Sequence, residues 1–262
     1  MHKVLFEIKN LDFSFGKKKI LQSLSLKIYE GDYLSIIGPN GSGKTTLIKC
    51  LINIYTPPEE KIFFNNIAIE KIEQKKLAAQ ISYVPQVTEQ SFPFTVNEFL
   101  MLARYPHFSR FTNTKPEDKK AIAEALDITG TSQLAERNLN TLSGGERQMI
   151  FIAAALAQGG KIILLDEPAT FLDPKHEHDI YKILKTIHQK ANKTIVTVTH
   201  NINSAILYSE KIALLKDGKI NYYGKATEIT ENNILENAYG RKFSFIKHPD
   251  SNKKIILPEV IK

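Results

Sequence analysis

The amino-acid sequence predicts an α/β fold, in which a mostly parallel sheet is covered by helices on both faces. Apolar runs at 33–37, 162–165 and 194–199 are typical of buried strands. Helical patterns at 46–52 and 175–191 lie between these runs. Buried strands that alternate with helices indicate parallel pairing, because the connection between parallel strands usually contains a helix.

Composition limits the class of protein. The chain has 262 residues, 42% of them hydrophobic, and a formal net charge of +7. These values are typical of a globular protein, and no apolar run reaches the roughly 20 residues of a membrane-spanning helix. The N-terminus has no signal-peptide core. The single cysteine, Cys50, excludes an internal disulfide and suits a reducing cytosol.

The lysines are not interleaved with aromatic residues, so we expect no nucleic acid partner. Compositional bias or contact with anionic lipid headgroups would explain the charge.

The N-terminal part predicts short antiparallel strands. Val4, Phe6 and Ile8 alternate with mostly polar neighbours, and residues 24–28 alternate in the same way. We expect an N-terminal antiparallel β subdomain, with Phe15 in the loop between its first two strands.

A glycine-rich loop follows the apolar strand 33–37. Residues 38–46 fit the pattern G-x-x-x-x-G-K-[ST], and a helix follows. Glycines let backbone amides approach a phosphate chain, and the N-terminus of the helix favours the same anion. We therefore expect a nucleotide site in which Lys44 reaches the β- and γ-phosphates and Thr45 holds Mg²⁺. The residues of this loop are Gly38, Pro39, Asn40, Gly41, Ser42, Gly43, Lys44, Thr45 and Thr46.

Residues 95–157 interrupt the α/β pattern with a helical insertion. Three pairs have capping-box spacing, which marks helix starts: Thr95 with Glu98, Thr114 with Glu117, and Ser143 with Glu146.

Two acids end the strand 162–165. The carboxyl ends of parallel strands carry the ligands of such sheets, so Asp166 and Glu167 should face the phosphate loop. Asp166 is then placed to help hold Mg²⁺, and Glu167 to orient an attacking water. The alternative is a solvated turn before Pro168.

A second anion site is expected at Ser143-Gly144-Gly145-Glu146, where a good N-cap precedes two glycines at a helix start. A plain capping box with glycines for close packing is the alternative. One nucleotide needs no second phosphate site on the same chain, so we expect two copies, each of which closes on the nucleotide of its partner.

Together these motifs make the chain resemble the ATP-binding subunits of ATP-binding-cassette (ABC) transporters, from about Phe6 to Gly224. The resemblance implies a P-loop NTPase (RecA-like) core at about 1–90 and 158–225. It also implies an inserted α-helical subdomain at about 91–157 and a short C-terminal tail, 226–262.

The resemblance also implies a role for each matching residue. Phe15 would stack on adenine, and Thr45, Gln86 and Asp166 would hold Mg²⁺. Glu167 would be the catalytic glutamate, assisted by Gln86 and by the switch histidine His200, which contacts the γ-phosphate. Asp173 would lie on the dimer seam. The residues expected to contact ATP are Phe15, Gly38, Pro39, Asn40, Gly41, Ser42, Gly43, Lys44, Thr45, Thr46, Ser143, Gly144, Gly145, Glu146 and Asp173.

Two positions depart from the family pattern. Thr170-Phe171 replaces the small residue that commonly precedes Leu172-Asp173, and Asn201 stands where many importer relatives have Asp. Both departures affect the seam or the surroundings of the site.

Residues 104–107 and 154–158 resemble the subfamily that serves importers of iron-siderophore complexes, haem and cobalamin. The resemblance implies an ATPase on the cytoplasmic side of the inner membrane, peripherally bound. Its partners would be permease subunits, a second copy of the chain and, indirectly, an external binding protein. Residues 87–115 are the expected docking surface for the permease. Importers of zinc, manganese or molybdate, an ABC exporter, and a soluble cassette protein remain alternatives.

Overall fold

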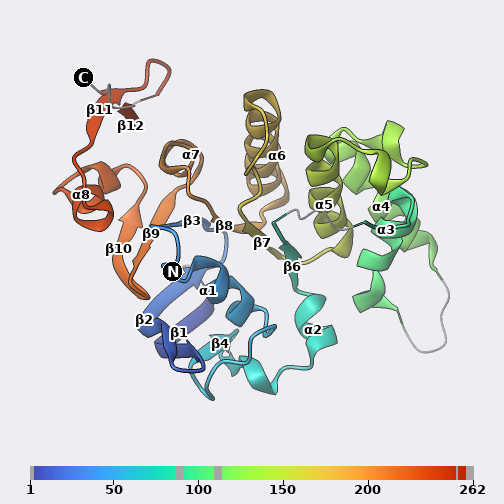
Figure 1. Cartoon of the computed structure of the whole chain (residues 1–262). Coiled ribbons are helices and arrows are strands. Elements are labelled where there is room, and N and C mark those ends of the chain that lie inside the picture. Colours follow the sequence, from blue (N-terminus) through green and yellow to red (C-terminus); the bar gives the residue numbers. More distant parts are fainter. Residues whose placement is uncertain (1–2, 87–90, 109–113, 252, 258–262) are drawn as a thin grey trace. The chain divides into compact units, whose positions relative to one another are not determined.

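The computed structural model describes residues 3–86, 91–108, 114–251 and 253–257 (Figure 1). The chain forms two compact units: Met1–Ile72 with Thr194–Lys262, and Glu73–Lys193. We refer to them as unit 1 and unit 2. None of the helices in the described ranges has both the length and the apolar character that crossing a membrane requires.

Unit 1 contains an antiparallel sheet in the order β2-β1-β4-β5. Its strands are β1 (Val4–Phe15), β2 (Lys18–Tyr29), β4 (Ile62–Phe64) and β5 (Ile67–Ala68). The expected loop around Phe15 is wrong, because β1 continues through Phe15, which pairs with Lys18 across a short turn. A shift of register between Ile8 and Leu11 lets this long hairpin continue after the first alternating stretch: Leu11 is buried, whereas Phe15 at the end of β1 is exposed.

A second set of strands in unit 1 is mostly parallel. β3 (Tyr33–Ile37) pairs in parallel with β8 (Thr194–Val198) and with β9 (Lys211–Lys216). β10 (Lys219–Lys225) runs antiparallel to β9. Every residue of β3 and β8 is buried, which agrees with the continuous apolar runs in the sequence.

The helices of unit 1 are α1 (Lys44–Leu51), α7 (Ile202–Tyr208) and α8 (Ile234–Tyr239), with short 3₁₀ turns η1 (Ile69–Lys71) and η5 (Glu228–Thr230). Cys50 is a buried residue of α1. Burial raises the pKa of its thiol to about 12, so the thiol stays protonated. After α8 the chain forms a hairpin, β11 (Ser244–Lys247) with β12 (Lys254–Leu257). The sequence predicted only a short helix in this tail.

Unit 2 carries two parallel strands, β6 (Ile81–Val84) and β7 (Ile162–Asp166). β7 is buried along its whole length. The helices α2 (Gln74–Ala78) and α6 (Pro174–Ala191) belong to the same unit.

The remaining helices of unit 2 are α3 (Val96–Ala103), α4 (Pro116–Thr129) and α5 (Gly144–Gln158), with 3₁₀ turns η2 (Tyr105–His107), η3 (Ser132–Leu134) and η4 (Leu139–Thr141). They share a core that includes Val96, Leu100, Ile122, Leu126, Leu139 and Ile150. The expected helical stretch at about 91–157 lies within unit 2, and its limits as a separate subdomain stay a prediction.

Two of the three predicted capping boxes are confirmed, at Thr95 and at Ser143. The box at Thr114 is wrong. α4 begins at Pro116, and its N-cap is Lys115, whose amide donates to Asp118 at 3.0 Å. Pro116 explains the shift, because proline favours the first helical position and leaves only its neighbour to act as the N-cap.

Candidate functional site

The phosphate loop connects β3 to α1, as the sequence predicted. Gly38 has a φ of +152°, and a Cβ at this position would overlap the carbonyl oxygen of Leu215. No other residue fits this turn without moving the neighbouring strand. The side chain of Lys44 is buried and folds back over the loop, where its ammonium donates to the carbonyls of Gly38 at 2.9 Å and Pro39 at 3.0 Å.

The hydroxyl of Ser42 in this loop also fits a bound phosphate. The hydroxyl of Ser42 is buried and has no hydrogen-bond partner within the described residues. A buried hydroxyl without a partner costs free energy, and a phosphate oxygen would satisfy it. Thr45 follows Lys44 in the first turn of α1, and its side chain is exposed.

Phe15 lies at the end of β1 and is 49% exposed. Its ring contacts Phe13 and Tyr55 edge-on, with centroid distances of 5.2 and 5.1 Å. These two neighbours hold the ring, while half of its surface remains open for stacking on a planar group, as the resemblance implies.

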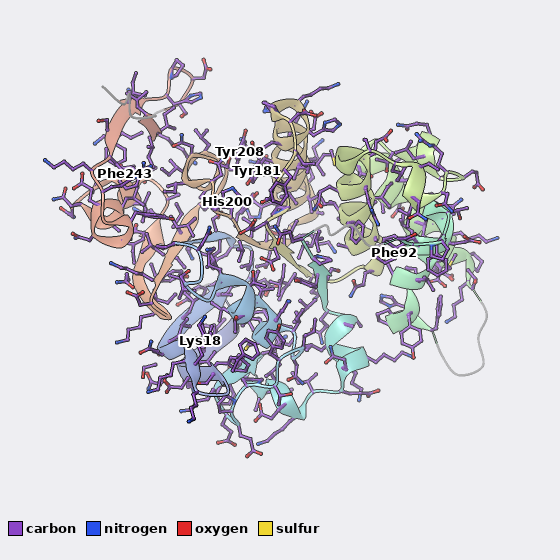
Figure 2. All side chains as sticks on the ribbon, in the orientation of Figure 1. Lys18, Phe92, Tyr181, His200, Tyr208 and Phe243 are labelled. Carbon is purple, nitrogen blue, oxygen red and sulfur yellow. The ribbon has the colours of Figure 1, made fainter. Side chains whose placement is uncertain are left out.

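His200 follows β8 and precedes α7, and its side chain is exposed (Figure 2). The residues on either side are fixed. The Thr199 hydroxyl accepts from the Asn201 amide at 3.0 Å, and the Asn201 side chain caps α7 by accepting from Ser204 at 3.0 Å. The backbone at His200 is therefore held by β8 on one side and by α7 on the other.

In unit 2, the end of β7 brings together Glu167, Gln86 and Thr170. Glu167 Oε2 accepts from Gln86 Nε2 at 3.3 Å and from Thr170 Oγ1 at 3.0 Å. Glu167 has a φ of +50°, in the left-handed region that non-glycine residues rarely adopt. Strained backbone of this kind is found preferentially at functional sites. Asp166, one residue earlier, is 3% exposed. Thr170 was not among the expected site residues.

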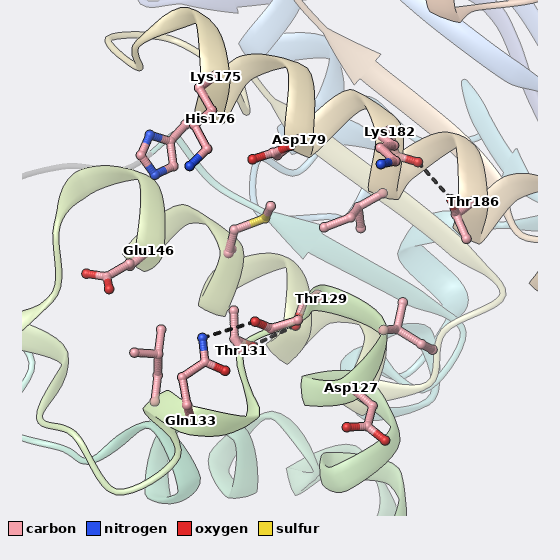
Figure 3. A pocket seen from close by; sticks show the side chains of 15 residues that line it. Asp127, Thr129, Thr131, Gln133, Glu146, Lys175, His176, Asp179, Lys182 and Thr186 are labelled. Atoms are coloured by element: carbon pink, nitrogen blue, oxygen red, sulfur yellow. Dashed lines mark hydrogen bonds between the residues drawn. The ribbon is translucent and has the colours of Figure 1, made fainter.

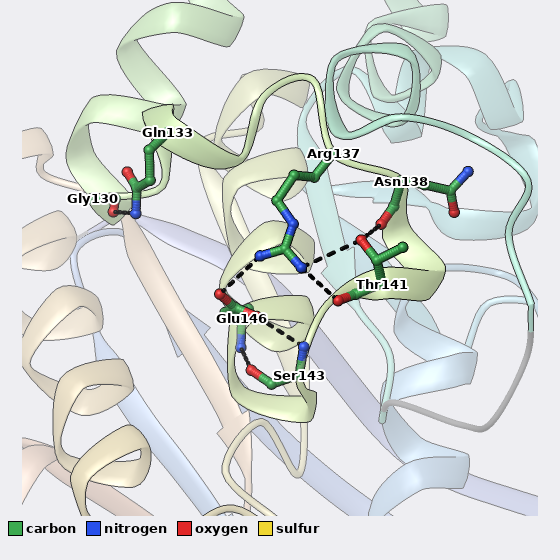
Figure 4. Close-up of polar contacts among 7 residues, drawn as sticks. All are labelled: Gly130, Gln133, Arg137, Asn138, Thr141, Ser143 and Glu146. Carbon is green, nitrogen blue, oxygen red and sulfur yellow. Dashed lines mark hydrogen bonds and ion pairs between the residues drawn. The ribbon is translucent and has the colours of Figure 1, made fainter.

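The signature stretch forms a polar network at the start of α5 (Figure 4). Ser143 and Glu146 make the reciprocal capping box: the Ser143 amide donates to Glu146 at 2.8 Å, and the Glu146 amide donates to Ser143 Oγ at 3.3 Å. Arg137 Nη1 lies 3.6 Å from Glu146 Oε1, and Arg137 Nη2 donates to the Thr141 carbonyl at 2.7 Å. The hydrogen bonds from Ser143, followed by the Arg137 charge, hold the pKa of Glu146 below its usual range. Glu146 is thus an anion that fixes the loop, and Gly144 in the first turn of α5 is exposed.

Asp173 and His176 link the seam loop to the signature stretch. Asp173 caps α6 by accepting from the amides of Lys175 at 2.9 Å and His176 at 3.0 Å, and its other oxygen lies 2.5 Å from His176 Nδ1. These bonds from His176, the backbone amide first, hold the pKa of Asp173 below its usual range. The His176 ring also lies against Gly145, where a Cβ would come within 2.8 Å of Nε2. A side chain at Gly145 would therefore have to displace the His176 ring. His176 was also missed, although a histidine three residues after a capping aspartate is a readable signal.

A cavity of about 560 Å³ opens in unit 2 beside these residues, with side chains of α6 facing α5 and the end of α4 (Figure 3). Glu146, Lys175 and His176 line one part of it, and Asp179 and Lys182 lie further along α6. The charges in its wall are of both signs. No residue of the phosphate loop lines it, so it is not where the sequence places the nucleotide.

The structure therefore places the expected residues in two groups. Unit 1 holds Phe15, the loop 38–46 and His200, and unit 2 holds Gln86, the signature stretch, Asp166, Glu167 and Asp173. Within unit 2, Gln86 contacts Glu167, whereas Asp173 contacts His176. The oxygen ligands offered by Thr45, Asp166 and Gln86 are of the kind that Mg²⁺ prefers. The role of each residue stays a prediction.

Comparison with known proteins gives consistent matches. The family model described as "ABC transporter" matches residues 21–170. The ferric enterobactin transport ATP-binding protein FepC of Escherichia coli is 34% identical over 250 residues, 95% of this chain and 92% of that protein. The iron(3+)-hydroxamate import ATP-binding protein FhuC of Bacillus subtilis is 34% identical over 249 residues, with 95% and 93% covered.

Solved structures of ABC transporters have a similar fold. An inward-facing structure of an ABC transporter assigned to the metal-chelate type matches with a TM-score of 0.83 and 28% identity, over 98% of this chain and 99% of that one. A bacterial ABC transporter cassette solved as a dimer matches with a TM-score of 0.73 and 30% identity, over 85% and 99%. These matches confirm the predicted fold class, a mixed α/β cassette with a parallel core sheet and an N-terminal antiparallel β subdomain.

Proposed function

Because this chain belongs to the family of ATP-binding subunits of ABC transporters, we propose that it powers import of an iron-siderophore type chelate through a membrane permease. ATP hydrolysis is the activity of the family. The observation that carries the substrate class is the match to FepC and FhuC over almost the whole chain, since both names give an iron chelate as the cargo. Haem and cobalamin are also metal chelates and fall within the same proposal.

The phosphate loop and Phe15 hold the nucleotide in this proposal. Lys44 leaves the carbonyls of Gly38 and Pro39 and turns to the β- and γ-phosphates. Thr45, Asp166 and Gln86 hold Mg²⁺, which would neutralise part of the phosphate charge.

Glu167 is the proposed catalytic base. It takes a proton from a water whose oxygen bonds to the γ-phosphorus, while the bond from that phosphorus to the bridging oxygen of ADP breaks. Gln86 and Thr170 support this role by orienting the carboxylate. His200 contacts the γ-phosphate and so distinguishes bound ATP from bound ADP.

Two copies of the chain act together in the proposal. The start of α5 in one copy, Ser143 to Gly145, closes on the nucleotide that the phosphate loop of its partner holds. The exposed Gly144 and the capped helix start suit an anion. The similar cassette that was solved as a dimer supports the arrangement. The chain would lie peripherally on the cytoplasmic side of the inner membrane, and an external binding protein would meet only the permease.

Residues 87–115 are the proposed docking surface for the permease. Tyr105 is 65% exposed and Leu102 is 54% exposed, so both are open to a partner. Phe92 and Phe94 pack against the helical core of unit 2 instead, and residues 87–90 and 109–113 lie outside the described residues. Cysteines placed at 102 and 105 should crosslink to loops of the permease. Reactivity only at sites elsewhere would reject this surface.

Uptake measurements test the cargo. Cells that lack this chain should lose uptake of radiolabelled ferric siderophore and regain it with the wild-type gene, but not with Lys44→Ala. Loss of zinc, manganese or molybdate uptake with normal siderophore uptake would favour the alternative importers. Normal uptake of all these cargoes, with an accumulated exporter substrate, would favour an ABC exporter.

A further inference from the structure

The C-terminal segment of unit 1 folds back onto α7, the helix that follows His200. Ala205 and Ile206 of α7 pack in one buried cluster with Leu235 and Ala238 of α8 and with Phe243. Ile256 of β12 packs against the same cluster. The tail is therefore part of the surroundings of α7 (Figures 1 and 2).

Asn203 joins α7 to the last strand by two hydrogen bonds. Its Nδ2 donates to the carbonyl of Ile256 at 3.0 Å, and its Oδ1 accepts from the amide of Ile256 at 2.7 Å. The side-chain amide thus pairs with β12 as a neighbouring strand would, which fixes both the distance and the orientation between α7 and the tail.

Lys253 holds the other end of the same helix. Its ammonium donates to the carbonyls of Ile206 at 2.8 Å, Leu207 at 2.8 Å and Ser209 at 3.4 Å. The last carbonyls of a helix have no partner within it, and a cation near them is favourable. The hydroxyl of Ser209 also bonds to Ser35 in β3, so the end of α7 is held from both sides.

The start of α7 lies directly after His200. Asn201 caps the helix, and its amide is bound to Thr199 at the end of β8. A shift of α7 along its axis therefore moves the Asn201 cap and the histidine before it. The tail fixes α7, and α7 fixes one side of the backbone at His200.

We propose that Lys253 and Asn203 are positioning residues, through which the C-terminal tail sets His200 at the distance needed to contact the γ-phosphate of ATP. This inference rests on the proposed function, because it requires His200 to touch that phosphate. ADP lacks the γ-phosphate, so the tail contributes to the affinity for ATP and not to the affinity for ADP.

The test compares the affinities for Mg·ATP and Mg·ADP in full-length protein carrying Glu167→Gln, in which hydrolysis is slow. Lys253→Met removes the three donated bonds and keeps the aliphatic stem. We expect it to lower the ratio of ATP to ADP affinity about fivefold or more, the lower end of typical coupling between sites. Lys253→Arg should restore most of the ratio. Lys254→Met, on the next and exposed residue of the hairpin, is the matched control and should leave the ratio unchanged.

Two further variants distinguish a failure of the positioning role from a failure of the role assigned to His200. His200→Ala should lower the same ratio, and Lys253→Met added to it should lower it no further. If His200→Ala lowers the ratio and Lys253→Met does not, the positioning role is wrong and the proposed function stands. If His200→Ala has no effect, the assigned role of His200 fails and the inference fails with it. Should Lys253→Met not fold, Asn203→Ala is measured in its place with the same expected result.

Discussion

The hydroxyl of Thr170 donates a hydrogen bond of 3.0 Å to the carboxylate of Glu167, three residues earlier in the same loop. The backbone of this loop is left-handed at Glu167, with a φ of +50°, and at Phe171, with a φ of +64°. One loop therefore carries both the proposed base, which is bonded to Gln86 and Thr170, and the exposed Phe171 ring. A change in the loop should affect both hydrolysis and the contact with a second copy.

Replacing Glu167 by Gln should remove the proposed base and keep the shape of the site. We expect ATP turnover to fall by about 10² to 10⁴-fold, the usual contribution of a positioned base, while ATP still binds. Phosphate release gives the turnover, and sedimentation with ATP should show a stable dimer because the nucleotide persists. Hydrolysis near the wild-type rate would remove Glu167 from the mechanism.

Thr170→Val should act through Glu167, since valine keeps the shape of threonine without its hydroxyl. A hydrogen bond to a charged group contributes about 1.5 to 3 kcal/mol, so we expect kcat to fall by roughly tenfold or more. KM for ATP should not change, because Thr170 has no predicted contact with the nucleotide. Thr170→Ser keeps the hydroxyl and is the control. A Thr170→Val enzyme with wild-type kcat would show that the hydroxyl of Thr170 does not orient the carboxylate.

The features that the sequence predicted well are encoded within a few neighbouring residues. The phosphate loop, the buried strands β3 and β8 and the capping box at Ser143 each follow from a local pattern. The contact between α7 and the C-terminal hairpin depends on partners far along the chain. Asn203 pairs with a strand 53 residues later, which no local pattern shows.

Two predictions made from local patterns were wrong: the capping box at Thr114 and the loop around Phe15. The capping box at Thr114 lost to Pro116, which moved the helix start by one residue. Phe15 was expected in the loop between two strands, whereas a register shift after Ile8 lets β1 continue to Phe15. Thr170 and His176 each contact a predicted site residue three positions earlier, so their spacing in the sequence was a signal that could have been read.

Phe171 should be an anchor between two copies. It is 92% exposed, and a large aromatic ring held open at a positive φ is costly unless a partner covers it. In protein carrying Glu167→Gln with ATP, Phe171→Ala should weaken dimerisation about tenfold by analytical ultracentrifugation, as truncation of an interface anchor does. The affinity for ADP should stay the same. Ile67→Ala, which shortens a 54% exposed residue in β5, is the control. Equal dimerisation in both variants would exclude Phe171 from the interface.

Arg104 should matter for stability rather than for contact with a permease. Its Nε donates to Asp118 at 2.8 Å, with side chains 11% and 4% exposed, and its Nη1 donates to the Ala157 carbonyl at 2.7 Å. It thus joins α4 to α5 from the end of α3. Arg104→Ala leaves Asp118 charged and buried, so the free energy of unfolding should fall by about 3 to 5 kcal/mol in urea titrations. Lys120→Ala breaks the exposed pair with Glu124 and should cost about 1 kcal/mol or less. Similar losses in both variants would contradict the burial argument.

Asp118 should also make stability depend on pH. The amide of Lys115 and then the guanidinium of Arg104 hold the pKa of Asp118 below its usual range in the folded chain. The unfolded chain therefore binds a proton more readily than the folded one, and this stabilisation is complete above the unfolded value of about 3.9. It is lost as the pH falls through the lower, folded value. Asp118→Asn removes this dependence, so its deficit against wild type should be largest near neutral pH and should shrink as the pH falls below about 4. Glu124→Gln, which removes a 63% exposed carboxylate, is the control. A deficit for Asp118→Asn that stays constant over this pH range would show that the loss comes from packing and not from the charge.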